Sequence, residues 1–233
     1  MSDSTAPLSP TSDPRITPAM EDYLKAIYGL QVSGDPVTNQ ALADELGYSG
    51  ASITNMQKRL HDLKLLVMEP YKGVRLTQAG TAVALEVIRH HRLLELYLAK
   101  TLGMDLDAVH EEADRLEHHV SEHLEELIAT ALGFPEFDPH GDPIPTSDLT
   151  IPEIDDHELR SQVGKDRVVV TRVSDRDAEI VRMLVSYGIV PGAQICGIEI
   201  DRATESVILQ MCSGDSVVIG GKSADAVRVK PLG

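Results

Sequence analysis

The sequence predicts a mainly α-helical chain with a winged helix-turn-helix near its N-terminus, a helical middle segment and a small β-barrel at its C-terminus. Two short helical patterns joined by a tight turn come before a small hairpin. Two long helical patterns follow, and the last third alternates short apolar runs with Gly and Asp turns. The length of 233 residues fits one or two domains.

The first predicted helix follows a polar tail. Residues 1–14 are rich in Ser, Thr, Pro and Asp, and we expect them to be disordered. Thr17-Pro18 begins a helix that runs to about Gln31, because a hydroxyl can cap the helix and Pro suits its first position. The apolar face of this helix consists of Tyr23, Leu24, Ile27, Tyr28 and Leu30.

The helix-turn-helix pattern lies next along the chain. Thr38 is expected to cap a helix from Asn39 to Leu46, and Ser49 to cap another from about Gly50 to Leu63. Strands over 66–69 and 74–76 flank a basic tip at 71–73. These elements predict a winged helix-turn-helix domain over residues 15–80.

Two long helices are predicted for the middle segment, from Thr77 to about Leu102 and from about Leu106 to Leu132, each followed by Gly. Residues 135–165 are rich in Pro, Asp and Gly and are expected to form a linker. The resulting boundaries are 81–147 for the helical domain, 148–165 for the linker proper and 166–233 for the β module. Within that module we expect strands over 168–173, 194–200, 207–211, 217–219 and 227–229, with a helix over about 177–187.

Several classes of protein are excluded by composition. No apolar run reaches the length of a membrane-spanning helix, and the N-terminus lacks the basic and apolar pattern of a secretory signal. Cys196 and Cys212 are too few and too far apart for a disulfide framework or a Cys-rich zinc site. We therefore expect a cytoplasmic protein.

The charge is unevenly distributed. The chain carries a net charge of −16, of which −10 falls on residues 81–147 and only −2 on residues 1–80. The middle segment also holds seven of the nine histidines. Carboxylates crowded into one segment repel one another unless a cation joins them.

The spacing of these groups predicts a metal site between two helices. On one helix over 106–132, His110, Asp114, Glu117 and His118 would lie within about 100° of arc, beside the apolar face. On the preceding helix, His91 and Glu95 are spaced i, i+4. Buried carboxylates and imidazoles are costly without a partner, and bundle metal sites are built from such residues on facing helices.

A surface ladder of salt bridges is the alternative for the acidic segment. The segment has fourteen acidic residues but only four basic ones, which disfavours a ladder. His90 is expected to be solvated, because His91 has the better helical phase. His119 and His123 are expected either to face solvent or to support the ligands.

Five stretches of the sequence resemble the diphtheria toxin repressor/manganese transport regulator family of dimeric, metal-activated transcriptional repressors. The matching stretches are MEDYLKAIYGL (20–30), ADELGYSGASITNMQKRLHDLKLL (43–66), YKGVRLTQAG (71–80), HHRLLELYL (90–98) and VHEEADRLEHH (109–119). The resemblance is strong over about 17–147. It is weaker over 166–233, where it implies an SH3-like module.

The resemblance implies two metal sites. Its primary site falls on Asp22, Asp114, Glu117 and His118, with His91 beside it. Its ancillary site falls on His91, Glu95 and His110, with a donor from the C-terminal module. Asp177 is the best match for that donor, and Glu179 or Asp175 could substitute.

The implied ligands are nitrogen and oxygen atoms only, which suits Mn(II) or Fe(II). The iron-sensing branch of the family has Met and Cys where this chain has Asp22 and Asp114, so the hard oxygen donors favour Mn(II). An Fe(II)-dependent repressor of the same fold is the main alternative. A helical metalloenzyme is disfavoured, because the sequence has no HExxH motif and no paired nucleophile. The third alternative is a winged-helix protein whose DNA binding is not controlled by metal.

The predicted DNA contacts lie on the third helix and on the hairpin. Small and hydroxylated side chains allow a helix to enter the major groove closely, and Asn can pair with adenine. The candidates are Ser49, Ala51, Ser52, Thr54, Asn55, Lys58, Arg59, Lys72 and Arg75. A homodimer would place two such helices on palindromic operator DNA.

Overall fold

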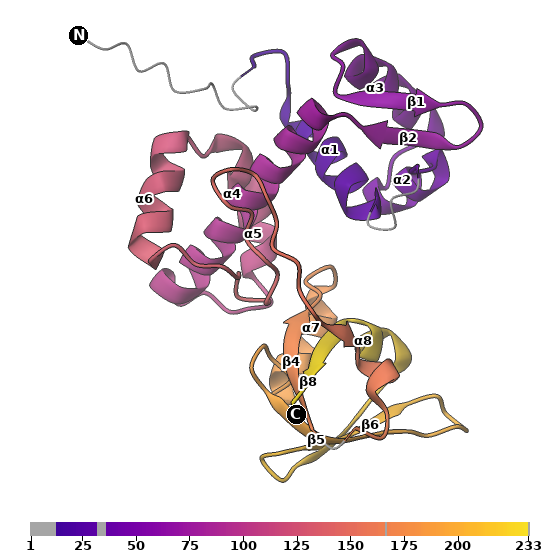
Figure 1. The fold of residues 1–233 in the computed structure, drawn as a ribbon, viewed down its shortest axis with the longest axis vertical. Coiled ribbons are helices and arrows are strands. Elements are labelled where there is room, and N and C mark those ends of the chain that lie inside the picture. The colour runs from indigo at the N-terminus through magenta and orange to yellow at the C-terminus, as the bar shows by residue number, and fades with distance from the viewer. Residues whose placement is uncertain (1–12, 32–35, 166, 233) are drawn as a thin grey trace. The chain divides into compact units, whose positions relative to one another are not determined.

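The structure is a computed structural model that describes residues 13–31, 36–165 and 167–232 (Figure 1). Most of the predicted tail, residues 1–12, lies outside the described residues. The described residues form two compact units. The first unit consists of residues up to His91 with 116–126 and 145–150. The second consists of 92–115, 127–144 and 151 onward.

The N-terminal elements of the first unit confirm the winged helix-turn-helix. They are α1 (Pro18–Leu30), α2 (Asn39–Leu46), α3 (Gly50–Asp62) and the antiparallel strands β1 (Leu66–Glu69) and β2 (Gly73–Leu76). The hydroxyl of Thr38 caps α2 by accepting from the Ala41 amide at 3.1 Å, and Ser49 caps α3 by accepting from the Ser52 amide at 3.3 Å. The hydroxyl of Thr17 makes no such bond, so only the Pro signal holds at the start of α1.

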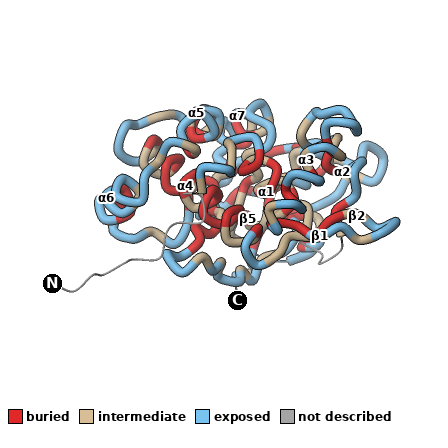
Figure 2. The backbone as a smooth tube through the Cα atoms, turned by 90° about the horizontal axis from the view of Figure 1, so that it is seen from above, coloured by how far each residue is buried: buried red, intermediate tan, exposed pale blue. Residues whose placement is uncertain are grey.

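One apolar core holds this domain together. α1 contributes Met20, Tyr23, Leu24 and Ile27, and the other elements close around them, as the buried stretch of α1 in Figure 2 shows. Val74 of the hairpin pairs with Val37 in the segment before α2, and Gly73 lies against the same segment. A Cβ on Gly73 would lie 2.1 Å from the Val37 carbonyl oxygen, and its φ of 132° disfavours any other residue.

α4 (Gln78–Leu102) is one continuous helix that contributes residues to both units. The predicted single helix over 106–132 is wrong. The chain forms α5 (Val109–Leu116), a 3₁₀ turn, η3 (Glu117–His119), and α6 (Glu122–Leu132). Val120 between them is extended, and the Ser121 hydroxyl accepts from the Leu124 amide at 3.3 Å, so Ser121 caps a new helix.

The C-terminal module of the second unit is a six-stranded antiparallel sheet in the order β3-β8-β4-β5-β6-β7. The strands are β3 (His157–Glu158), β4 (Val168–Val173), β5 (Gln194–Ile200), β6 (Val207–Met211), β7 (Ser216–Ile219) and β8 (Val227–Pro231). α7 (Ala178–Ser186), α8 (Gly221–Asp225) and the 3₁₀ turn η4 (Leu159–Gln162) connect them. The pairings among the described strands leave β3 and β7 at the ends of the sheet, so it does not close into a complete barrel.

Two features of the second unit differ from the sequence predictions. Cys196 and Cys212 form a disulfide, with Cα atoms 5.1 Å apart. Antiparallel pairing of β5 with β6 sets Ile195 opposite Met211, so the two cysteines become neighbours across the hairpin despite their separation in sequence. The expected linker over 135–165 is packed in part: most residues from 138 to 145 are buried, and the carbonyl of the fully buried His140 accepts from the Val173 amide at 2.9 Å.

Candidate metal centres and DNA-binding surface

The first cluster of metal-binding side chains, Asp22, Glu117 and His118, lies in the first unit. One donor atom from each lies within 4.8 Å of the others. His118 Nε2 is 2.9 Å from Asp22 Oδ1, and its Nδ1 is 2.5 Å from Glu21 Oε2. The break after α5 makes this possible, because η3 turns the imidazole toward α1.

His118 holds a proton in this arrangement. Burial opposes protonation, but the hydrogen bonds to Asp22 and Glu21 and the charge of Glu117 raise the pKa of the imidazole to about 10. The cluster therefore gathers three carboxylates around one cationic ring at neutral pH. A divalent ion is the natural replacement for that proton, since metal ligands must be deprotonated.

Glu117 is buried, with 1% of its side chain exposed. Lys25 Nζ donates to both of its carboxylate oxygens at 2.9 Å, and His91 Nδ1 is 2.5 Å from Glu117 Oε2. His91 is thus brought to the first cluster, as the resemblance implied. Glu21 was not identified from the sequence as part of a metal centre.

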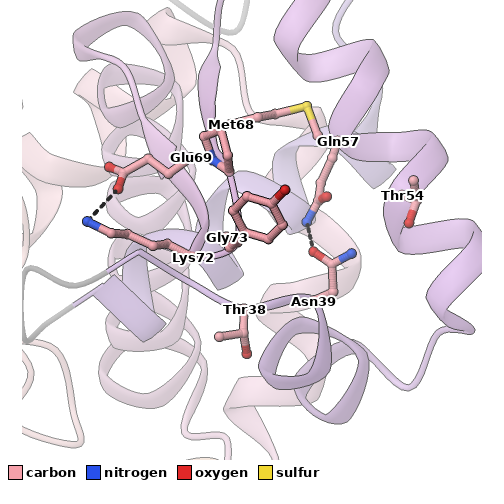
Figure 3. Close-up of a pocket in the computed structure, with 10 residues that line it drawn as sticks. Thr38, Asn39, Thr54, Gln57, Met68, Glu69, Lys72 and Gly73 are labelled. Atoms are coloured by element: carbon pink, nitrogen blue, oxygen red, sulfur yellow. Dashed lines mark hydrogen bonds and ion pairs between the residues drawn. The ribbon is translucent and has the colours of Figure 1, made fainter.

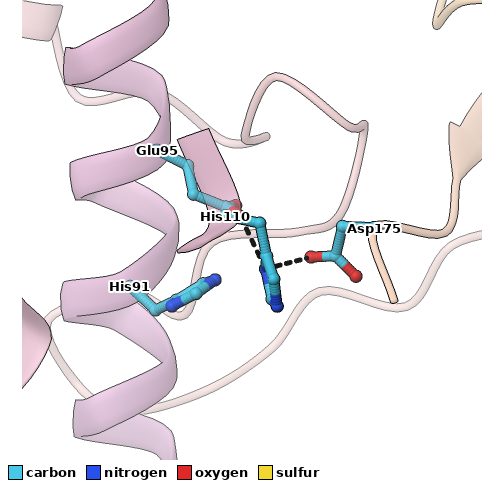
Figure 4. A group of neighbouring side chains, drawn as sticks. All are labelled: His91, Glu95, His110 and Asp175. Atoms are coloured by element: carbon cyan, nitrogen blue, oxygen red, sulfur yellow. Dashed lines mark hydrogen bonds and ion pairs between the residues drawn. The ribbon is translucent and has the colours of Figure 1, made fainter. Parts of the chain in front are cut away.

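The second cluster lies in the second unit and centres on Glu95, which is fully buried. His110 Nδ1 is 3.1 Å from Glu95 Oε1 and 3.2 Å from Asp175 Oδ2, as the dashed lines in Figure 4 show. Burial would raise the pKa of Asp175, but its hydrogen bond to His110 lowers it below the usual range. Glu95 and His91 lie on successive turns of α4.

Asp138 and His140 extend the second cluster from the opposite side of Glu95. His140 Nδ1 is 3.7 Å from Glu95 Oε2, and the donor atoms of these three residues lie within 4.8 Å of one another. Neither Asp138 Oδ2 nor His140 Nδ1 makes a hydrogen bond among the described residues. Burial and the nearby carboxylate of Glu95 raise the pKa of Asp138. Buried donors in this state fit a divalent cation.

One sequence-predicted ligand, Asp177, lies away from the candidate metal groups, whereas Asp114 lies beside His110 on α5. Asp177 caps α7, because its carboxylate accepts from the amides of Glu179 and Ile180. The alternative, Asp175, is the carboxylate that reaches His110. Asp114 lies one turn after His110 on α5, with 48% of its side chain exposed and its Oδ2 3.5 Å from His110 Nε2.

The remaining histidines of the acidic segment divide into buried and exposed. The expectation that His90 is solvated is wrong: it is 3% exposed, with Nε2 3.0 Å from Glu125 Oε2. His119 and His123 are exposed. Only its residue type distinguished His140 in the sequence, since it falls in the segment that was expected to be a linker.

The candidate DNA-binding surface is the outer face of α3. Ile53, Gln57 and Leu60 are buried, which leaves Ala51, Ser52, Asn55, Lys58 and Arg59 exposed, with Ser49 exposed at the cap. Thr54 is half-buried and its hydroxyl donates to the Gly50 carbonyl at 2.9 Å. An open hollow of about 470 Å³ separates α3 from the hairpin, lined by residues such as Asn39, Thr54 and Lys72 (Figure 3).

The hairpin carries an acidic residue among its basic ones. Arg75 Nε is 2.5 Å from Glu69 Oε1, and Lys72 Nζ is 3.9 Å from Glu69 Oε2. Both predicted phosphate contacts of the hairpin are therefore partly neutralised within it.

Among the described helices, none is both long and apolar enough to cross a lipid bilayer.

Three family models match the chain in succession. They describe the N-terminal DNA-binding domain of iron-dependent repressors over residues 15–74, the metal-binding and dimerisation domain of the same repressors over 77–146, and an FeoA domain over 161–231.

Curated proteins and solved structures agree with these models. The iron-dependent repressor IdeR of Mycobacterium tuberculosis is 30% identical over 227 residues, covering 91% of this chain and 96% of IdeR. The diphtheria toxin repressor of Corynebacterium jeikeium is 33% identical over 159 residues, 66% of each chain. A manganese-dependent transcriptional repressor in complex with manganese superposes with a TM-score of 0.83 at 35% identity, covering 91% of this chain and all of that one.

Proposed function

We infer the function from the premise that this chain belongs to the iron-dependent repressor family: it is a metal-dependent, DNA-binding transcriptional repressor and not an enzyme. We propose further that the activating ion is Mn(II), and that the genes it controls serve manganese uptake and metal homeostasis. We also propose that it acts in the cytoplasm as a homodimer on palindromic operator DNA. Its match to a metal-binding and dimerisation domain supports the dimer.

The donor chemistry supports Mn(II). The first cluster would hold one ion through Asp22, Glu117 and His118, with His91 beside them and Asp114 as the remaining ligand that the resemblance implies. The second would hold another through Glu95, His110 and Asp175, and Asp138 and His140 form a further candidate group with the other carboxylate oxygen of Glu95. Every one of these donors is oxygen or imidazole nitrogen, a set that suits Mn(II) and lacks the sulfur that softer ions prefer.

One observation carries the proposed switch: α1 contacts the metal cluster and the recognition helix at once. Asp22 on α1 meets His118 at 2.9 Å, while the next residue, Tyr23, donates its hydroxyl to the Ile53 carbonyl of α3 at 3.1 Å. Tyr23 and Ile53 are both fully buried, so α1 and α3 move together.

The bound ion would supply a divalent positive charge between α1 and η3. The chain's own residues link that charge to DNA. Asp22 fixes the position of α1 at the cluster, the contact of Tyr23 with Ile53 couples α1 to α3, and the exposed face of α3 binds DNA. Metal occupancy then favours the DNA-competent arrangement, because the ion binds more tightly where all its ligands converge. Two recognition helices in a dimer would fit half-sites about 34 Å apart.

An Fe(II)-dependent repressor of iron uptake is the second candidate. The similarity to IdeR and to the diphtheria toxin repressor favours it. Both candidates share every residue named above and differ only in the activating ion.

The test is fluorescence anisotropy with a labelled palindromic DNA from a metal-uptake promoter. The full chain is titrated with chelator, with Mn(II), and anaerobically with Fe(II). Asp22→Ala removes a first-cluster ligand, and Glu199→Ala removes an exposed carboxylate on β5 as the matched control. Binding that needs Mn(II), fails in Asp22→Ala and persists in Glu199→Ala supports the proposal. Equal activation by Fe(II) supports the second candidate, and metal-independent binding in all variants refutes both.

A further inference from the structure

We propose that Lys25 is the counter-ion of Glu117 in the first cluster: its ammonium group neutralises Glu117 in the metal-free protein, and an arriving divalent ion must displace it. Lys25 then sets the metal concentration at which the repressor responds. This inference rests on the proposed function, in which the first cluster binds the activating ion.

The contacts of Lys25 are those of a counter-ion. It lies three residues after Asp22 on α1, so both side chains leave the helix on the same face toward η3. Its Nζ is 2.9 Å from both carboxylate oxygens of Glu117 and 3.3 Å from His91 Nδ1. The ammonium group thus engages both oxygens through which Glu117 could bind a metal ion.

The ion pair between Lys25 and Glu117 is shielded from water, unlike a salt bridge on the surface. Glu117 has 1% of its side chain exposed, and Lys25 has 25%. A carboxylate so deeply buried requires a compensating charge, and Lys25 supplies it when no ion is bound. The lysine stem reaches solvent, so the ammonium group has a path out of the cluster.

A divalent ion competes with Lys25 for the same oxygens. Once bound to Asp22 and His118, the ion would take Glu117 as a ligand, and an ammonium group left in place would repel it at short range. Removing the charge of Lys25 therefore raises metal affinity in two ways. The metal-free state loses its counter-ion, and the metal-loaded state loses a repulsion. A lysine that merely supported the fold would give the opposite sign, because its loss would disorder the ligands.

The experiment measures Mn(II) affinity of the chelator-stripped full chain by isothermal titration calorimetry. Lys25→Gln removes the charge but keeps a donor for Glu117, Lys25→Met removes both, and Lys25→Arg keeps the charge. We expect the neutral variants to bind Mn(II) at one site about tenfold more tightly, which corresponds to about 1.4 kcal/mol. Lys25→Arg stays within about threefold of wild type. The second cluster is the internal reference, and its affinity stays unchanged.

Melting temperature gives a readout independent of affinity. Metal-free Lys25→Met should melt below metal-free wild type, because Glu117 is left buried without its counter-ion. The Mn(II)-loaded variant should melt at or above Mn(II)-loaded wild type, because the repulsion between the ion and the ammonium group is lost. Unchanged or weaker binding by both neutral variants overturns the inference.

The Asp22→Ala and His118→Ala variants separate this inference from the proposed function. If they bind as much Mn(II) as wild type, the first cluster is not the metal site and the proposed function fails with it. If they lose one site while the neutral Lys25 variants match wild type, only the role of Lys25 fails.

Discussion

Replacing His140 with Ala should remove most of the thermal stabilisation that Mn(II) gives the second unit. His140 is fully buried, and its Nδ1 faces Glu95 Oε2 at 3.7 Å without a hydrogen bond among the described residues. In the metal-free protein, burial and the nearby carboxylate of Glu95 raise the pKa of Asp138 and so oppose its ionisation. A divalent ion would satisfy these groups together, and the imidazole would be one of its few neutral donors.

The magnitude follows from mass action. Mn(II) at a hundredfold excess over its dissociation constant stabilises the folded state by about 2.7 kcal/mol. At about 2–4 °C per kcal/mol for a chain of this size, wild type gains about 5–10 °C. If losing one donor weakens binding about a hundredfold, the same Mn(II) concentration gives only about 0.4 kcal/mol, or about 1–2 °C.

Differential scanning calorimetry on chelator-stripped protein, with and without Mn(II), measures this difference. His140→Ala also loses the hydrogen bond between Nε2 and the Leu106 carbonyl, at 3.0 Å, which costs about 1 kcal/mol in both states. The informative quantity is therefore the Mn(II)-induced shift within each variant. His123→Ala, which removes an exposed histidine on α6, is the matched control and should keep the full shift. A full Mn(II)-induced shift in His140→Ala would refute the group of Glu95, Asp138 and His140 as a cation site.

Three further predictions concern the hairpin and the C-terminal module. Glu69→Gln should strengthen DNA binding about threefold and steepen its salt dependence in anisotropy titrations, because Arg75 becomes available to phosphate; an unchanged slope would contradict this. Burial opposes ionisation of Asp156, but its bonds to Arg172 and Arg228 lower its pKa below the ordinary value. A lowered folded-state pKa stabilises the protein above the unfolded pKa of about 3.8 and loses that contribution as pH falls. Asp156→Asn should therefore lower the free energy of unfolding, measured with denaturant at pH 7, by about 2 kcal/mol. The difference between wild type and variant should shrink below pH 4, and a difference that does not depend on pH would show that the ion pairs of Asp156 are not its cause. Reduction of the Cys196–Cys212 disulfide, or Cys212→Ser, should destabilise the C-terminal sheet by about 3 kcal/mol, since the bond closes a loop of 16 residues. Identical unfolding with and without reductant would show that the bond contributes nothing.

The elements with strong local signals were predictable to within a residue or two. α2 begins at Asn39 and ends at Leu46 as predicted, because a hydroxyl cap and a glycine in the left-handed region both act within the local chain. The five strands that were predicted for the C-terminal module agree to within two residues, since β-branched runs between turns depend on nearest neighbours, whereas β3 lies in the expected linker and was not predicted. The prediction of one helix over 106–132 was wrong, although the helical periodicity of the sequence continues through Val120 and Ser121. In the folded chain the Ser121 hydroxyl caps a separate helix instead.

The candidate site was predictable by residue type but not by partner. Asp22, Glu117 and His118 meet as the resemblance implied, yet Glu21 comes from the same helix as Asp22 and carries no distinguishing local signal. Asp175 and Asp177 differ by two residues, and only the helix start decides which of them caps α7 and which reaches His110. Asp138 and His140 escaped notice because tertiary packing buries a segment whose composition resembles a solvated connection.

Charge alone is a poor explanation for how metal would control DNA binding. Two divalent ions would change the net charge of the chain from −16 only to about −12, so the protein would stay strongly acidic. The contact of Asp22 with His118 and that of Tyr23 with Ile53 instead provide a geometric route through α1. Salt distinguishes the two explanations, because ions screen exposed charges beyond about 10 Å at 0.1 M, whereas contacts within a packed helix are screened much less. If geometry controls binding, raising the salt weakens DNA affinity with and without Mn(II) alike, and the ratio of the two affinities stays constant. A ratio that falls toward one as salt rises would mean that the ion acts by reducing repulsion, and the route through α1 would then be refuted.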